Sequence, residues 1–144
     1  MSHAQAIGAA FLFTWFGMVV AISFLEAPLK FRAPGVTLEI GLGIGRLVFR
    51  ALNIGEVILG AGVASTLIAG PWCWRIVVPA GVALAALFVQ LTALRPALSR
   101  RTRAVLAGSG TSGSWAHHAY IALEGTKVVA LLAAGILTLT LVRG

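Results

Sequence analysis

Ionisable and polar side chains recur inside two apolar stretches of this sequence of 144 residues. They are Arg50, Asn53 and Glu56 in the first stretch, and His117, Tyr120, Glu124 and Lys127 in the second. Residues three or four positions apart lie on the same face of an α-helix. Each set therefore predicts a polar stripe along one helix, and together the stripes form a candidate polar seam that binds a solute or a proton.

Charges of opposite sign are expected to meet between the two stripes. The first stripe starts at Arg46 and the second at His117, and Glu56 and Lys127 each follow ten residues later, about 15 Å along the helix at 1.5 Å per residue. We expect Glu56 to pair with Lys127, and Glu124 to receive hydrogen bonds from Asn53 and Arg50. An ion pair within the second helix competes, because Glu124 and Lys127 are about one turn apart. The arrangement requires that the two helices are neighbours with level ends.

The seam has a functional and a structural interpretation, because an ionisable group inside a membrane-spanning helix is costly and is retained for a reason. In the functional one, the seam opens to the cytoplasm and binds or moves a polar small solute or a proton. Glu56 and Glu124 accept protons, and Lys127 provides the counter-charge. Arg46 and Arg50 attract anions, and His117 takes up protons at the mouth. In the structural interpretation, the charges only fix how the two helices are oriented. Removing one partner of a buried pair would leave the other charge unpaired, which costs about 3 to 5 kcal/mol of stability.

The sequence predicts neither a catalytic set nor a metal site. His117 and His118 are adjacent and point about 100° apart on a helix. Along the axis His117 lies about 10.5 Å from Glu124, whereas metal–ligand bonds are about 2 Å long. Cys73 is the single cysteine, which excludes an intramolecular disulfide and a thiolate cluster within one chain. No nucleotide-binding or Ser-His-Asp pattern is present, and the residues alone name no cofactor.

The elements that carry these residues are predicted to be membrane-spanning helices. Hydrophobic residues make up 59% of the chain, charged residues only 10%, and the mean hydropathy is +0.98, whereas about a quarter of a soluble domain is charged. A span needs about 20 apolar residues. We therefore expect residues 1–144 to form a single all-α domain, an integral membrane four-helix bundle. The expected spans are about 4–26, 46–69, 76–94 and 115–142.

Basic residues predict how the spans are oriented. Lys30 and Arg32 follow the first span, and a group of arginines follows the third. Positively charged loops stay on the cytoplasmic side, so both termini are expected on the outer side of a multi-pass protein of the plasma (inner) membrane. The net charge of +7 is attributed to these loops and to anionic lipid headgroups, and not to nucleic acid. The arginines expected at the lipid are Arg95, Arg100, Arg101 and Arg103.

Two motifs near the N-terminus resemble those of a known family. Residues 15–17 (Trp-Phe-Gly) and residues 23–31 (Ser-Phe-Leu-Glu-Ala-Pro-Leu-Lys-Phe), with His117 opening the last helix, are similar to the small four-helix membrane family of unknown function that includes a eukaryotic platinum-drug-resistance protein. The resemblance covers roughly half of the chain, through short motifs. It implies four spans, no assigned chemistry and at most a role in export, with Pro28, Phe31 and His117 as family positions.

Residues 50–56 (Arg-Ala-Leu-Asn-Ile-Gly-Glu) resemble the Arg, Ala, Asn, Glu signature of the membrane-associated eicosanoid and glutathione metabolism family. This resemblance implies a trimeric, glutathione-dependent membrane enzyme of four helices per chain. It implies that Arg50, Asn53 and Glu56 bind glutathione and that Arg95 or another basic residue stabilises the thiolate. The spacing before Asn53 is shorter than in that family, and the expected third span contains no tyrosine.

Three classes of function therefore stay open on the sequence. They are the binding or movement of a polar solute or proton, a glutathione-dependent membrane enzyme, and a structural or accessory subunit of a larger membrane complex. Membrane-spanning helices associate through faces of small residues and through polar contacts. We accordingly expect a homo-oligomer or a partner within a membrane complex.

Overall fold

The structure, a computed structural model, describes residues 2–94 and 115–141, and within these ranges it contains helices and short connectors but no strand. Four helices are long and apolar enough to cross a membrane. They are built on α1 (His3–Val19), α3 (Leu38–Ala69), α4 (Trp74–Val89) and α6 (Trp115–Leu141). The expected all-helical fold with four long apolar helices is confirmed.

Polar caps define where the first two long helices begin. The Ser2 hydroxyl accepts a hydrogen bond from the Gln5 backbone amide (3.2 Å), and the Gln5 side chain accepts one from the Ser2 amide (2.9 Å). This reciprocal capping box satisfies amides that the helix itself leaves unpaired. Thr37 caps α3 by accepting from the Ile40 amide (3.2 Å). Because this cap precedes the glycine-spaced stretch 38–45, that stretch is part of α3, which begins before the expected span 46–69.

Two of the long helices change to π-helical winding. After α1 the chain continues without a break through the π-helical segment η1 (Val20–Glu26), the short α2 (Ala27–Leu29) and the 3-10 turn η2 (Lys30–Arg32). At the end of η1 the Ala27 amide donates to the Ile22 carbonyl, five residues back. Pro28 follows at once, and a proline cannot donate the next backbone hydrogen bond. A second π-helical segment, η3 (Gln90–Leu94), extends α4.

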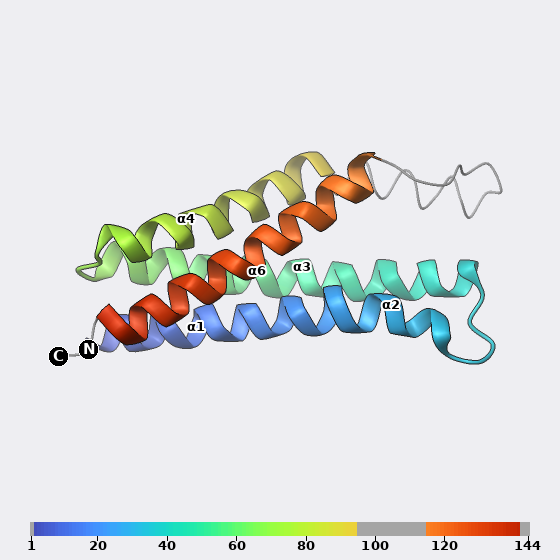
Figure 1. Ribbon diagram of the computed structural model, residues 1–144, viewed down its shortest axis with the longest axis horizontal. Helices are drawn as coiled ribbons and strands as arrows, with labels where there is room; N and C mark the ends of the chain where they lie inside the picture. Colours follow the sequence, from blue (N-terminus) through green and yellow to red (C-terminus); the bar gives the residue numbers. More distant parts are fainter. Residues whose placement is uncertain (1, 95–114, 142–144) are drawn as a thin grey trace.

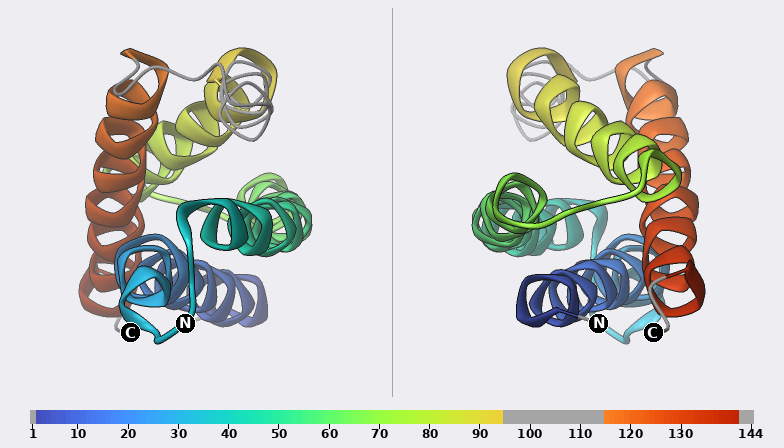
Figure 2. Two further views of the ribbon diagram at one scale, coloured as in Figure 1. Left: turned by 90° about the vertical axis from the view of Figure 1, so that its right-hand side faces the viewer. Right: turned by 90° about the vertical axis from the view of Figure 1, so that its left-hand side faces the viewer.

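The four long helices run alternately up and down, so that both chain ends lie at the same end of the molecule (Figure 1). Seen end-on, α3 and α6 lie on opposite sides of the interior, with α1 between them on one flank and α4 on the other (Figure 2). The closest backbone packing is between α4 and α6, α1 and α3, and α1 and α6. The two helices expected to carry the polar stripes therefore face each other across the bundle.

Polar contacts close the end of the bundle that carries the termini. The Gln5 side chain donates to the Pro71 carbonyl (3.0 Å), and the Trp72 indole donates to the Thr66 carbonyl (2.6 Å). A Cβ at Gly8 would lie 2.8 Å from the Trp72 ring. Only glycine lets α1 approach this ring so closely, and the connector between α3 and α4 is thereby held over the end of α1.

The helices bury a narrow interior and present apolar side chains outward. Leu12, Val63, Ala83 and Leu131 belong to the core, each buried, whereas Ile68 is 87% exposed. Between 28% and 39% of each apolar window is buried within the structure. Soluble monomers rarely expose so much apolar surface. It is typical of helices that face lipid on the outside and one another on the inside.

Candidate buried charge site

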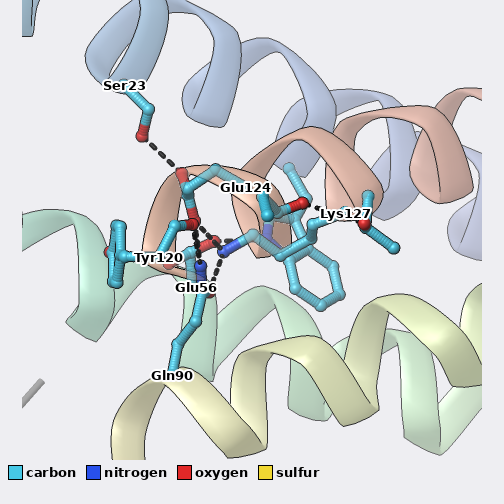
Figure 3. A network of polar contacts seen from close by, with 9 residues as sticks. Ser23, Glu56, Gln90, Tyr120, Glu124 and Lys127 are labelled. Atoms are coloured by element: carbon cyan, nitrogen blue, oxygen red, sulfur yellow. Dashed lines mark hydrogen bonds and ion pairs between the residues drawn. The ribbon is translucent and has the colours of Figure 1, made fainter. Parts of the chain in front are cut away.

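Lys127 lies at the centre of a buried set of polar contacts (Figure 3). Its ammonium is 2.5 Å from Glu56 Oε1, 2.6 Å from Glu124 Oε1 and 2.6 Å from Gln90 Oε1. An ammonium has three hydrogens to donate, so these three acceptors use its full capacity. The residue is 0% exposed, and its charge is therefore compensated entirely from within the protein.

Glu56 stands on the interior face of α3 and uses its two oxygens differently. Oε1 accepts both from Lys127 and from the Trp15 indole, at 3.0 Å in the second case. Oε2 is buried, and no residue within the described ranges forms a hydrogen bond with it. Glu56 is 0% exposed. One oxygen of this carboxylate is thus satisfied, while the other has capacity left for a proton.

Glu124 accepts hydrogen bonds on both oxygens. Oε1 accepts from Lys127 and from the Gln90 side-chain amide, the latter at 2.7 Å, and Oε2 accepts from the Ser23 hydroxyl at 2.5 Å. The Gln90 amide also reaches the Tyr120 backbone carbonyl at 3.4 Å. Hydrogen bonds to an ionised group are short and about twice as strong as those between neutral groups. Glu124, which stands on α6, is consequently tied to the extensions of both α1 and α4.

We refer to the six connected side chains as the charge network. They are Trp15, Ser23, Glu56, Gln90, Glu124 and Lys127. Every one of the four long helices or its π-helical extension contributes to it. Ser23 lies in η1 and Gln90 opens η3, so both neutral ligands of Glu124 come from π-helical turns. Such turns are found frequently at functional sites.

The charged groups of the charge network are buried and do not balance, and Ser23 is the one member of the network that is partly exposed. Gln90 is 1% and Glu124 is 2% exposed, like the fully buried Glu56 and Lys127. Two carboxylates thus share one ammonium at a depth where charges are weakly screened. An isolated buried carboxylate is so unfavourable that it takes up a proton instead. The arrangement is suited to hold one exchangeable proton and to let Lys127 shift between two acceptors.

Of the residues expected to form the polar seam, the structure brings Glu56, Glu124 and Lys127 together. The expected ion pair between Glu56 and Lys127 is confirmed, and so is the competing pair between Glu124 and Lys127 on their own helix. Asn53 and Tyr120 are also buried, about one turn from Glu56 and Glu124 respectively. The Tyr120 ring packs edge-on against Phe49, with 6.2 Å between ring centroids.

Arg50 lies elsewhere, exposed on α3, and Glu124 takes its donors from Ser23 and Gln90 instead of Asn53 and Arg50. The reason is the period of the α-helix. Glu56 follows Arg50 by six positions, so at 3.6 residues per turn the two side chains point about 120° apart. Arg50 therefore faces outward, whereas Asn53 and Glu56 face the interior of the bundle. The three residues that the second resemblance assigns to glutathione binding thus do not all lie on one face of the helix.

Several predicted positions lie outside the described residues. The side chain of His117, expected at the mouth of the seam, is one of them. The others are the arginines expected at anionic lipid, namely Arg95, Arg100, Arg101 and Arg103.

The sequence patterns did not point to Ser23 and Gln90 as ligands of Glu124. Both are uncharged and stand in apolar runs, and the π-helical winding around them does not follow the ordinary α-helical period. The available signal was the chemistry of Gln90, because an amide inside an apolar span needs a hydrogen-bonding partner. Trp15 is both a core residue and a ligand of the site, since it is 0% exposed and its indole donates to Glu56.

Across residues 2–94 and 115–141, no group of three His, Cys, Asp or Glu side chains is placed to hold a metal ion. Comparison with known proteins gives no relative, because no family model, curated protein or solved structure matches the chain. The chemistry of the charge network is therefore the basis on which a function can be inferred.

Proposed function

We propose that this chain is an integral protein of the plasma (inner) membrane and that its charge network binds and transfers protons, alone or coupled to the movement of a polar small solute. The observation that carries the proposal is the burial of two carboxylates against one ammonium, Glu56 and Glu124 against Lys127. Charges placed inside membrane-spanning helices typically mark ion or proton pathways.

The apolar exterior supports the membrane location. Four helices are long and apolar enough to span a bilayer, and most of each apolar window faces outward. The segment η2, which carries Lys30 and Arg32 and follows α2, lies at the end of the molecule opposite the start of α1 (Figure 1). By the positive-inside rule this end faces the cytoplasm and both termini face outward. The charge network then lies near mid-membrane, since Glu56 stands in the middle part of α3.

The charge imbalance supports proton binding. With both carboxylates ionised, the buried network carries one uncompensated negative charge, and taking up a proton removes it. Among the side chains that the structure describes, the titratable groups at this site are Glu56 from α3 and Tyr120, Glu124 and Lys127 from α6. The neutral donors Trp15 and Ser23 come from α1 and its extension, and Gln90 comes from the extension of α4. Glu56 Oε2 offers a buried position for the proton.

The ammonium of Lys127, which the two carboxylates share, supports proton transfer rather than proton storage. A proton that binds Glu56 weakens its attraction for Lys127, which is left to Glu124 and Gln90. A proton that binds Glu124 has the opposite effect and favours the pair between Lys127 and Glu56. Lys127 thereby couples the two carboxylates, so that a proton on one of them disfavours a proton on the other. Such coupling is what a stepwise proton carrier needs.

The proposal is tested by proton flux in proteoliposomes loaded with the pH indicator pyranine, with an imposed potassium diffusion potential. We expect the native chain to move protons, the double variant Glu56→Gln/Lys127→Met to show only the leak of protein-free liposomes, and Glu39→Gln to equal the native chain. Glu39 is a matched control because it is an exposed glutamate in the first turn of α3.

The double variant removes opposite charges together and leaves no stranded partner on that pair. A folded double variant with native flux overturns the proposal, and so does a native chain without flux. In that case the remaining interpretation is a structural one, in which the network holds the helices of an accessory subunit together. Co-purification of a fixed partner in stoichiometric amount supports that interpretation.

A further inference from the structure

A separate ion pair lies between the charge network and the cytoplasmic end of the proposed topology. Lys30 Nζ is 3.9 Å from Glu26 Oε2, and the side chains are 10% and 31% exposed respectively. Neither residue belongs to the charge network. Glu26 is therefore a partly open carboxylate, and its partner is a mostly buried lysine.

The position of Lys30 is built by residues of two helices. Its ammonium lies 5.4 Å from the ring centroid of Phe31 and 5.8 Å from that of Phe49 on α3. Aromatic faces attract cations at such distances. A Cβ at Gly45 would lie 2.7 Å from Lys30 Nζ, so the lack of a side chain there admits the ammonium. The pair between Glu26 and Lys30 is thus held against α3 and is not a free surface pair.

Ser23 is a polar residue of the first helix between this ion pair and Glu124. The Ser23 hydroxyl is 2.5 Å from Glu124 Oε2, and Glu26 follows Ser23 by three residues in the same π-helical segment η1. Beside these polar groups, the rings of Phe49 and Tyr120 pack edge-on against each other between α3 and α6. A route for protons toward the cytoplasmic end is therefore offered by the polar side chains of the first helix rather than by this aromatic pair.

We propose that Glu26 is the outer proton-binding carboxylate of this protein, and that it exchanges protons between the aqueous phase near the 33–37 connector and the charge network through the Ser23 hydroxyl. This inference rests on the proposed function. It assigns the cytoplasmic mouth of the pathway to the first helix, whereas the sequence pattern had placed it at His117 on the last.

The transfer balances without any further reactant. The protonated Glu26 gives its proton to Ser23 Oγ, directly or through a bridging water. As that O–H bond forms, Ser23 gives its own hydroxyl proton to Glu124 Oε2. The products are an ionised Glu26, an unchanged serine and a protonated Glu124. Lys30 then stabilises the ionised Glu26, and Lys127 is released from Glu124 toward Glu56.

The test uses the same liposome flux assay with the full chain. We expect Glu26→Gln and Ser23→Ala to lower the proton flux about tenfold or more, as loss of a proton-transfer group does. Ser23→Thr retains a hydroxyl and is expected to keep most of the flux. Glu39→Gln, which removes an exposed glutamate near the same end of the molecule, is expected to leave it unchanged.

Two comparisons separate this inference from the proposed function. Native flux in both Glu26→Gln and Ser23→Ala, with loss of flux in Glu56→Gln/Lys127→Met, overturns the route and leaves the proposed function intact. Native flux in all these variants overturns both. Should Glu26→Gln fail to fold, the comparison of Ser23→Thr with Ser23→Ala decides, because equal flux in the two contradicts a hydroxyl relay.

Discussion

Glu56 and Lys127 form a 2.5 Å ion pair although the helices that carry them face each other across the bundle instead of packing side by side. The distance is bridged because both side chains are long and extend into the same interior space. Neighbouring helices α1 and α4 supply the groups that complete the site, Trp15 from one and Gln90 from the extension of the other. The pair therefore joins two helices that have little direct backbone contact with each other.

Replacing Lys127 by methionine is expected to lower the free energy of unfolding by about 3 to 5 kcal/mol, because two buried carboxylates lose their shared partner. The double variant Glu56→Gln/Lys127→Met is expected to recover part of this loss. Unfolding is followed by far-ultraviolet circular dichroism during titration with sodium dodecyl sulfate in mixed micelles. Arg50→Met, at an exposed position on α3, is the control, with an expected change within about 0.5 kcal/mol. Equal stability of Lys127→Met and Arg50→Met contradicts the prediction.

Replacing Gln90 by leucine removes an acceptor from Lys127 and a donor from Glu124. Hydrogen bonds to charged groups contribute about 1.5 to 3 kcal/mol, and we expect a destabilisation of at least that size in the same titration. Thr92→Val is the matched control on the same helix extension, because Thr92 is exposed and its hydroxyl donates only to the Phe88 carbonyl one turn back. A loss no larger than that of the control means that Gln90 is not a ligand of the charged groups.

Trp15 is expected to report protonation of Glu56 by its fluorescence, because its indole donates to that carboxylate. In a chain whose other tryptophans are replaced by phenylalanine, the emission of Trp15 should change with pH in a single transition. Glu56→Gln should abolish that transition. Because Trp15 is 0% exposed, iodide should not quench it in either form. A transition that persists in Glu56→Gln assigns the signal to another group.

Cys73 offers a direct test of orientation, since it is exposed in the connector at the end of the molecule that carries the termini. A membrane-impermeant maleimide is expected to label Cys73 in cells whose outer envelope layers have been removed and whose inner membrane is intact. With Cys73→Ser as background, Ala33→Cys in the opposite connector should be labelled only after the membrane is permeabilised. The reverse pattern overturns the orientation derived from the basic residues, and labelling of both sites in intact cells excludes four complete spans.

The central charges could be predicted from the sequence because depth, helical face and sign of charge are all readable in it. Glu56 and Lys127 pair as expected for that reason. Arg50 was placed incorrectly because the α-helical period, followed over six residues, carries it about 120° away from Glu56. Ser23 and Gln90 could not be placed by periodicity, since each lies where the winding changes to π-helical.

The same changes of winding separate the neutral ligands from the charged ones. Glu56, Glu124 and Lys127 stand on regular α-helix, while Ser23 and Gln90 stand on turns of wider winding. A π-helical turn that relaxes to α-helix rotates the residues beyond it without displacing the helix as a whole. Glu124 could thereby lose one neutral partner while every long helix keeps its place, so a small local rewinding is sufficient to alter the solvation of a charge at the centre of the molecule.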